Sequence, residues 1–256
     1  MEYKTSSLFP SSGLVHGFFG RRGGVSLTPY DSLNVSLAVG DVAAQVEENK
    51  KKILCACELE TSTLATVHQV HGTRVCVVAS QEEASRLASE EADALITEVP
   101  GIALGMMTAD CAPVLLYDPQ AQRIAAVHAG WKGAFLGVVE ETVRVLQKQG
   151  SAPQALYAVI GPCIQQVSYK VSEAFRRLFL EKEPCWDTFF SGQDSLSLFF
   201  NLPGFLHHRL LQLGVTQIEV FREDTYAHPD FFSFRRAREE TQGVCGRQLS
   251  LIALKG

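Results

Sequence analysis

Short turns, rather than helices, join many of the strand-like segments of this chain, and this spacing limits the folds that it can adopt. Residues 113–118 (PVLLYD) and 123–130 (RIAAVHAG) flank the turn-forming stretch DPQAQ. Two other pairs of strand-like segments are separated by HGT and by a Val-Pro-Gly turn: residues 64–70 with 74–80, and residues 92–97 with 102–108. Successive parallel strands would need longer, usually helical, connections. The spacing therefore favours an α+β layered fold over a doubly wound one.

Helical periodicity appears at only a few places between the strands. Residues 42–59 carry apolar side chains at helical spacing, which predicts an amphipathic helix. Further helices are expected at residues 133–150, 171–182 and 202–214. No Gly-x-Gly-x-x-Gly segment opens a helix after a strand, so we expect no dinucleotide site. The 256 residues show no repeat, linker or low-complexity segment, which indicates a single domain over residues 1–256.

The charge balance and the cysteines exclude several classes of protein. The formal net charge of −5 argues against a nucleic-acid partner, which usually needs a basic face. The longest apolar run, GIALGMM, is far too short to cross a membrane, so no membrane partner is expected. Seven cysteines stand at irregular spacings, and no secretory signal pattern precedes them. We therefore expect a soluble, cytoplasmic protein with reduced thiols.

Three strand-like segments end in a side chain that can bind a metal ion: His71, Cys111 and His128. An antiparallel return through DPQAQ would bring His128 back to within a few positions of Cys111, while His71 would arrive from a third segment. Two histidines and one cysteine form a three-ligand set, which is typical of a catalytic zinc ion with a fourth position left for water or substrate. A structural zinc site would need a fourth protein ligand at close spacing, and the chain lacks that pattern.

Two other interpretations of these residues stay open at this level. Cys111 could be a nucleophile, with His128 as its base and Asp110 as the orienting acid, as in a thiol hydrolase. Adjacent strand residues point to opposite faces, however, so Asp110 is a poor orienter for Cys111. The residues could also belong to a non-enzymatic metal-binding protein. Loss of activity in Cys111→Ala would not separate these hypotheses, whereas metal content would.

The same segments resemble the laccase-domain family, the YfiH-type proteins once called multicopper polyphenol oxidoreductases and now described as purine nucleoside phosphorylases. The resemblance covers nearly the whole chain and is specific, because the motifs occur in the family's order. The matching segments are HGFFGRRGGVSLTPYDSLNV, HQVHGTRV, ADALIT, TADCAPVLLYD, AAVHAGWKG, IGPCIQQVSYKV, FFSFRR and GRQLSLIAL. One departure stands out: where many members carry Cys-Thr, this chain has Asp224-Thr225, so no role of that cysteine is carried over.

The resemblance implies a fold, a metal and an activity. The implied fold is a layered α/β sandwich with mixed, largely antiparallel sheets flanked by helices, as in the cytotoxic necrotizing factor catalytic domain. The implied metal is zinc held by His71, Cys111 and His128; copper is the alternative, but three ligands make at most one site. The implied activity is phosphorolysis of adenosine, inosine and methylthioadenosine to the base and ribose 1-phosphate, with some adenosine deamination. Some members are described instead as peptidoglycan-precursor editing amidases.

Phosphorolysis needs a site that binds phosphate, and the Gly-flanked Arg21 and Arg22 are the candidates that the sequence offers. Arg235 and Arg236 are weaker candidates for the same role. Asp110 is expected either to accept a hydrogen bond from a ligand histidine or to cap the end of a strand. The sequence leaves the oligomeric state, the preferred substrate and the roles of Arg235, Arg236 and Asp224 open.

Overall fold

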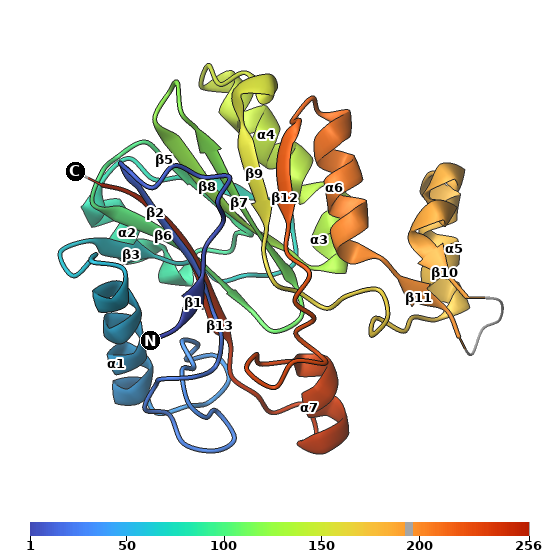
Figure 1. Ribbon diagram of the computed structural model, residues 1–256, viewed down its shortest axis with the longest axis horizontal. Coiled ribbons are helices and arrows are strands. Elements are labelled where there is room, and N and C mark those ends of the chain that lie inside the picture. Colours follow the sequence, from blue (N-terminus) through green and yellow to red (C-terminus); the bar gives the residue numbers. More distant parts are fainter. Residues whose placement is uncertain (193–196, 256) are drawn as a thin grey trace.

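Two open sheets form the centre of the protein in the computed structural model, which describes residues 1–192 and 197–255 (Figure 1). The larger sheet has six strands in the order β12 (Gln217–Val220), β9 (Tyr157–Ile160), β7 (Ala112–Asp118), β8 (Arg123–Ala129), β5 (Ala94–Thr97) and β4 (Val75–Val77). The pairs β9–β7, β7–β8 and β8–β5 are antiparallel, and the two outer pairs are parallel. Every residue of β7 and β8 is buried, so both faces of this sheet are covered by other layers.

The smaller sheet has five strands in the order β1 (Tyr3–Lys4), β2 (Leu14–Phe19), β13 (Gln248–Leu254), β6 (Ile102–Thr108) and β3 (Thr63–Ala65). β13 lies between β2 and β6 and is antiparallel to both. A separate two-stranded sheet pairs β10 (Phe190–Ser191) with β11 (Phe199–Phe200). The sheets are therefore mixed and largely antiparallel, as expected from the sequence.

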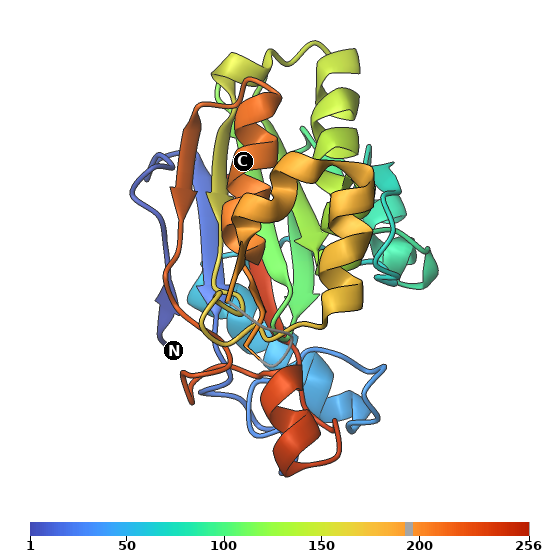
Figure 2. The ribbon, with the colours of Figure 1, turned by 90° about the vertical axis from the view of Figure 1, so that its right-hand side faces the viewer.

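Three hydrophobic clusters show that the layers follow the order helix, sheet, sheet, helix. Between the two sheets, Leu104 and Ile252 of the smaller sheet pack with Leu115 of the larger one. On the outer face of the smaller sheet, Ile53 of α1 (Ala43–Ala56) packs with Leu251. Three helices cover the outer face of the larger sheet: α3 (Trp131–Leu136), α4 (Val138–Lys148) and α6 (Leu202–Gln212). This arrangement confirms the layered α/β sandwich (Figure 2).

The remaining helices are short or peripheral. They are α2 (Gln81–Arg86), α5 (Glu173–Lys182) and α7 (Phe234–Glu240), with 3-10 turns at Leu87–Ser89, Pro153–Ala155 and Pro184–Phe189. In both views, α7 and the loop of residues 20–42 lie at the same end of the molecule, beyond the ends of the sheets (Figures 1 and 2). In the part of the chain that the structure describes, no helix combines the length and apolar composition that a membrane span requires.

The helix predicted at residues 133–150 is wrong in one respect, because the structure divides this stretch into α3 and α4. Gly137 separates them with a φ of 103°, a left-handed conformation that an α-helix cannot contain. The Gly137 amide closes α3 on the Gly133 carbonyl, and the Gly137 carbonyl accepts the Glu141 amide in the first turn of α4. Glycine adopts this conformation without a steric penalty, so the chain can bend here and keep both helices on the sheet.

The prediction that these neighbouring strands pair with each other is also wrong for two of the three pairs. β7 and β8 form the predicted hairpin, but β3 and β4 lie in different sheets, and so do β5 and β6. The chain does turn between these strands as predicted, but each turn carries it from one sheet to the other. Because β3 is parallel to β6, the crossings from β3 to β4 and from β6 to β7 start at the same end of the smaller sheet. These two crossings carry His71 and Cys111.

Candidate metal centre

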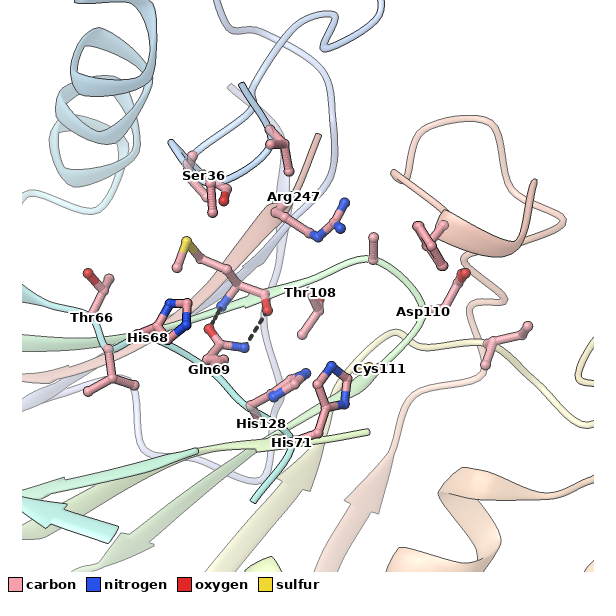
Figure 3. Close-up of a pocket in the computed structure, with 18 of the residues that line it drawn as sticks. Ser36, Thr66, His68, Gln69, His71, Thr108, Asp110, Cys111, His128 and Arg247 are labelled. Atoms are coloured by element: carbon pink, nitrogen blue, oxygen red, sulfur yellow. Dashed lines mark hydrogen bonds between the residues drawn. The ribbon is translucent and has the colours of Figure 1, made fainter. Parts of the chain in front are cut away.

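His71, Cys111 and His128 come together at the end of the sandwich where the chain crosses between the sheets. One potential ligand atom from each residue lies within 4.8 Å of the others. The rings of His71 and His128 meet edge to face, with centroids 4.7 Å apart. Figure 3 shows the three side chains together at one wall of a cavity. The convergence expected of these residues is therefore present in the structure.

The β7–β8 hairpin places His128 beside Cys111. His128 pairs with Pro113 across the two strands, so Cys111 precedes β7 at the end where β8 finishes. The His128 side chain is almost fully buried, and its Nδ1 lies 2.8 Å from Oδ1 of Asp93. Asp93 directly precedes β5, whose first residue pairs with Val127. Because Nδ1 is engaged with the carboxylate, Nε2 is the nitrogen of His128 that can bind a metal ion.

The same carboxylate holds the loop that carries His71. The Asp93 oxygens accept hydrogen bonds from the backbone amides of His71, at 2.9 Å, and Gly72, at 2.6 Å. His71 has a φ of 58°, which is uncommon for a residue other than glycine. Asp93 stabilises this loop conformation, since its oxygens satisfy amide groups that would otherwise be left without acceptors. One buried aspartate therefore positions two of the three candidate ligands.

Asp110 positions the segment around the third candidate ligand. Its carboxylate accepts hydrogen bonds from the Thr225 hydroxyl at 2.8 Å, the Ser233 hydroxyl at 3.0 Å and the Arg235 amide at 2.7 Å. Asp110 has a φ of 85° and ties the β6–β7 crossing to the start of α7. The expected hydrogen bond from a ligand histidine goes to Asp93 instead. The structure therefore also gives Asp110 no contact as the orienting acid of a Cys111–His128 pair.

Gly130 leaves the space in which the three ligand atoms meet. A Cβ atom at this position would lie 2.6 Å from Nδ1 of His71 and 2.8 Å from Sγ of Cys111. These distances are far below van der Waals contact, so any side chain here would collide with two candidate ligands. Gly130 directly follows β8 and is the N-cap of α3, so the glycine lies where the chain passes from the strand into the helix.

Burial and charge act in opposite directions on the ionisable groups of the cluster. Burial alone would lower the pKa of His128, but its interactions with Cys111 and Asp93 outweigh burial and raise the pKa to about 9. Burial alone would raise the pKa of Asp93, but the hydrogen bonds from His128 and Gly72 lower it below its usual value. Burial lowers the pKa of His71, and the nearby His128 adds to this effect. The site thus favours ionised Asp93, which suits a carboxylate that orients a ligand.

A cavity of about 690 Å³ opens beside the cluster. Its wall combines apolar residues such as Leu37 with polar ones such as Ser36 and His68, and it includes the three candidate ligands. The carboxamide of Gln69 bonds both the amide and the carbonyl of Met107, which fixes part of this wall (Figure 3). The volume lies in the range of small-molecule sites.

The structure places Arg21 and Arg22 away from this cavity. Arg21 donates to the carbonyl and the carboxylate of Asp31, and Arg22 pairs with Asp230 at the surface. Neither arginine contributes to the cavity wall. Of the weaker candidates, Arg235 lines the cavity, while Arg236 donates to backbone carbonyls such as that of Tyr226.

The fold and the cluster define a class of protein, an α/β sandwich with a candidate site for one metal ion. The chain belongs to the multi-copper polyphenol oxidoreductase laccase family, whose model matches residues 15–255. A relative from Shigella flexneri named purine nucleoside phosphorylase YfiH is 36% identical over 237 residues, covering 91% of each chain. A purine nucleoside phosphorylase from Corynebacterium glutamicum is 33% identical over 237 residues, covering 93% of each chain. A crystal structure of a Neisseria meningitidis protein matches with a TM-score of 0.87 at 30% identity, covering 99% of each chain.

Sequence reasoning missed Asp93 and Arg247. Asp93 stands in ADALIT, which the sequence pattern identifies only as a strand-like segment, although an aspartate among apolar residues is itself a signal of a buried, paired carboxylate. Arg247 precedes the last strand and lines the cavity. It lies in the matching segment GRQLSLIAL, so that resemblance was the signal that could have pointed to it.

Proposed function

We propose that this protein is a zinc-dependent purine nucleoside phosphorylase. Its substrates would be adenosine, inosine or methylthioadenosine together with phosphate, and its products the free base and ribose 1-phosphate. The observation that carries the proposal is the convergence of His71, Cys111 and His128 at the wall of a cavity of small-molecule size. The names of the relatives support the choice of reaction.

The residues present fit a bound zinc ion. Zinc accepts imidazole nitrogen at about 2.0–2.1 Å and thiolate sulfur at about 2.3 Å. Two nitrogens and one sulfur around a tetrahedral ion at these distances lie about 3.3–3.6 Å apart, which is compatible with three atoms within 4.8 Å of one another. Gly130 keeps this space free of a side chain. Two histidines and a cysteine also suit copper, so a metal analysis has to distinguish the two ions.

The chemistry requires a sugar, a base and a phosphate in one enclosed site. A phosphate oxygen forms a bond with C1′ of the ribose while the bond from C1′ to the purine nitrogen breaks. The electron pair of that bond leaves with the purine, which takes up the proton that phosphate gives up. A bound metal ion supplies Lewis-acid polarisation of a substrate oxygen or nitrogen. We assign ligand roles to His71, Cys111 and His128, and a positioning role to Asp110.

The protein's own residues would bind and orient the substrates. Apolar groups of the wall, among them Leu37, Val39 and Phe234, offer a surface for the purine ring. Ser36 and His68 offer polar groups for the ribose hydroxyls or the edge of the base. Asp93 holds the two histidines in place, so the ligand geometry exists before substrate enters.

Metal content and turnover, measured on the same samples, test the proposal. We expect about one zinc ion per chain and release of adenine from adenosine only when phosphate is present. Cys111→Ser and His128→Ala should lose both the metal and the turnover, whereas the exposed Cys55→Ser should keep both. Inosine formation from adenosine would reveal the additional deaminase activity.

Other outcomes would replace the proposal. Release of an amino acid from a cell-wall precursor without phosphate would favour the editing amidase. Stoichiometric metal without turnover of either substrate would favour a metal-binding protein that is not an enzyme.

A further inference from the structure

We propose that the guanidinium group of Arg247 binds the phosphate substrate, with Arg235 and Arg238 on the same cavity wall. The inference rests on the proposed phosphorylase function and assigns the anion site within it. It replaces the role expected for Arg21 and Arg22, which lie outside the cavity. The probe ligand is inorganic phosphate.

The arginines of the cavity differ from those of the surface in their partners. Arg21 and Arg22 pair with the carboxylates of Asp31 and Asp230. Across residues 1–192 and 197–255, by contrast, no carboxylate forms an ion pair with Arg235, Arg238 or Arg247. All three arginines line one cavity in a chain with a net charge of −5, and the carboxylate of Asp110 lies on the same wall. Three guanidinium groups without an ion-pair partner outweigh this one carboxylate, and a net positive wall attracts an anion.

Arg247 has the hydrogen-bond donors that an anion needs. Its Nη1 donates to the carbonyl oxygens of Cys245 and Gly246, both at 3.0 Å. Its Nε and Nη2 have no acceptor among the residues that the structure describes. One nitrogen therefore anchors the side chain, and the two others remain for a ligand. A guanidinium presents such donors as a planar fork that matches phosphate oxygens.

The backbone holds Arg247 in position before any ligand binds. Its amide donates to Oδ1 of Asn34 at 2.9 Å, and its carbonyl accepts the amide of Val35 at 3.1 Å. The guanidinium carbon lies 5.7 Å from the centre of the Phe234 ring. These contacts reduce the conformational entropy that binding would otherwise cost.

The location suits attack on a nucleoside bound at the metal centre. Arg247, Ser36 and the His71–Cys111–His128 cluster line the same cavity (Figure 3). A phosphate held there would share the cavity with the substrate atoms that the metal polarises.

The test measures the KM for phosphate and the KM for adenosine separately, by steady-state kinetics of the zinc-loaded protein. Arg247→Gln should raise the KM for phosphate by about 10- to 100-fold, because a charge-assisted hydrogen bond is lost, while the KM for adenosine changes less than about twofold. Arg247→Lys should cause a smaller rise, because it keeps the charge without the fork. Arg86→Gln, which removes an exposed charge on α2, should leave both constants unchanged. Titration calorimetry with phosphate should show the same order of affinities.

Several results would contradict the assignment of phosphate binding to Arg247. An unchanged phosphate KM in Arg247→Gln would overturn the inference, and so would a larger rise in Arg22→Gln. If Arg247→Gln fails to fold, an unchanged phosphate KM in Arg247→Lys would also overturn the inference. Phosphate binding that depends on Arg247 in a protein without phosphorolysis would instead preserve the anion site and reject the proposed function.

Discussion

Asp93 and His128 form a buried pair, with Oδ1 of Asp93 2.8 Å from Nδ1 of His128 and the Asp93 side chain fully inaccessible to solvent. The same carboxylate accepts the amides of His71 and Gly72. It therefore connects the β3–β4 crossing to the end of β8, and the geometry of the candidate metal centre depends on it.

Asp93→Asn should weaken metal binding by about 10- to 100-fold, since the histidine partner loses its charge and a hydrogen-bond acceptor. Competition with a chromophoric chelator measures the affinity. Asp118→Asn is a matched control, because Asp118 is also buried and accepts backbone amides, but at the far end of β7. Equal loss of metal affinity in both variants would contradict the positioning role of Asp93.

Gly130→Ala should abolish stoichiometric metal binding, because its Cβ would approach two ligand atoms to within 3 Å. Gly133→Ala is the control: its Cβ would lie 3.1 Å from the Gly72 carbonyl and near no ligand atom. Metal analysis of both purified variants gives the result. A Gly130→Ala protein with a full complement of metal would show that the ion binds elsewhere.

Removal of the metal with a chelator should lower the melting temperature. A ligand present at 100 times its Kd stabilises the folded state by about 2.7 kcal/mol, which corresponds to about 5–10 °C for a chain of this size. Differential scanning calorimetry with and without chelator measures the change. Cys111→Ser should not respond to the chelator, and a response equal to that of the wild type would place the stabilising ion outside the cluster.

Asp110→Asn should destabilise the protein while leaving the metal content intact. The carboxylate accepts three hydrogen bonds and is buried, and burial raises its pKa despite those bonds. Loss of a hydrogen bond to a charged group costs about 1.5–3 kcal/mol. Urea unfolding and metal analysis together distinguish this role from that of a ligand. Loss of metal at unchanged stability would argue for a direct role at the ion.

Acid should destabilise the protein through His16, on β2. Its Nε2 accepts the Ser6 amide at 2.7 Å, which requires a neutral ring, and burial, partly offset by Glu219, lowers the pKa from 6.5 to about 4. The unfolded state therefore binds more protons between these values. The stabilisation, about 3 kcal/mol at most, is complete above pH 6.5 and is lost as the pH falls toward 4.

Urea unfolding of the wild type, His16→Gln and His207→Gln between pH 7 and 4 measures the His16 contribution. The loss of stability over this range should be smaller in His16→Gln than in the wild type. His207→Gln, a change on α6, should follow the wild type. Identical pH dependence in all three proteins would assign the acid sensitivity to other groups.

The sequence predicted the features that depend on local chemistry. The β7–β8 hairpin follows from one turn between two apolar runs, and that hairpin brings Cys111 to His128. The sheet assignment of β3, β4, β5 and β6 could not be predicted, because a turn signal shows where a strand ends but not which sheet the next strand joins. The partners of Arg21 and Arg22 could not be predicted either: both arginines lie in a glycine-rich loop, and their ion pairs join them to Asp31 and Asp230, 10 and 208 positions away in the sequence. The phosphate-binding role expected of these two arginines stays a prediction.

The position of β13 has a consequence for synthesis of the protein. β2 and β6 are both translated long before β13, yet one edge of each forms its hydrogen bonds with that late strand. During synthesis, these two edges stay unpaired until β13 is made, and Arg247 joins the cavity wall only then. Nascent chains should therefore acquire the hairpin and its histidine first, and the completed anion-binding wall last.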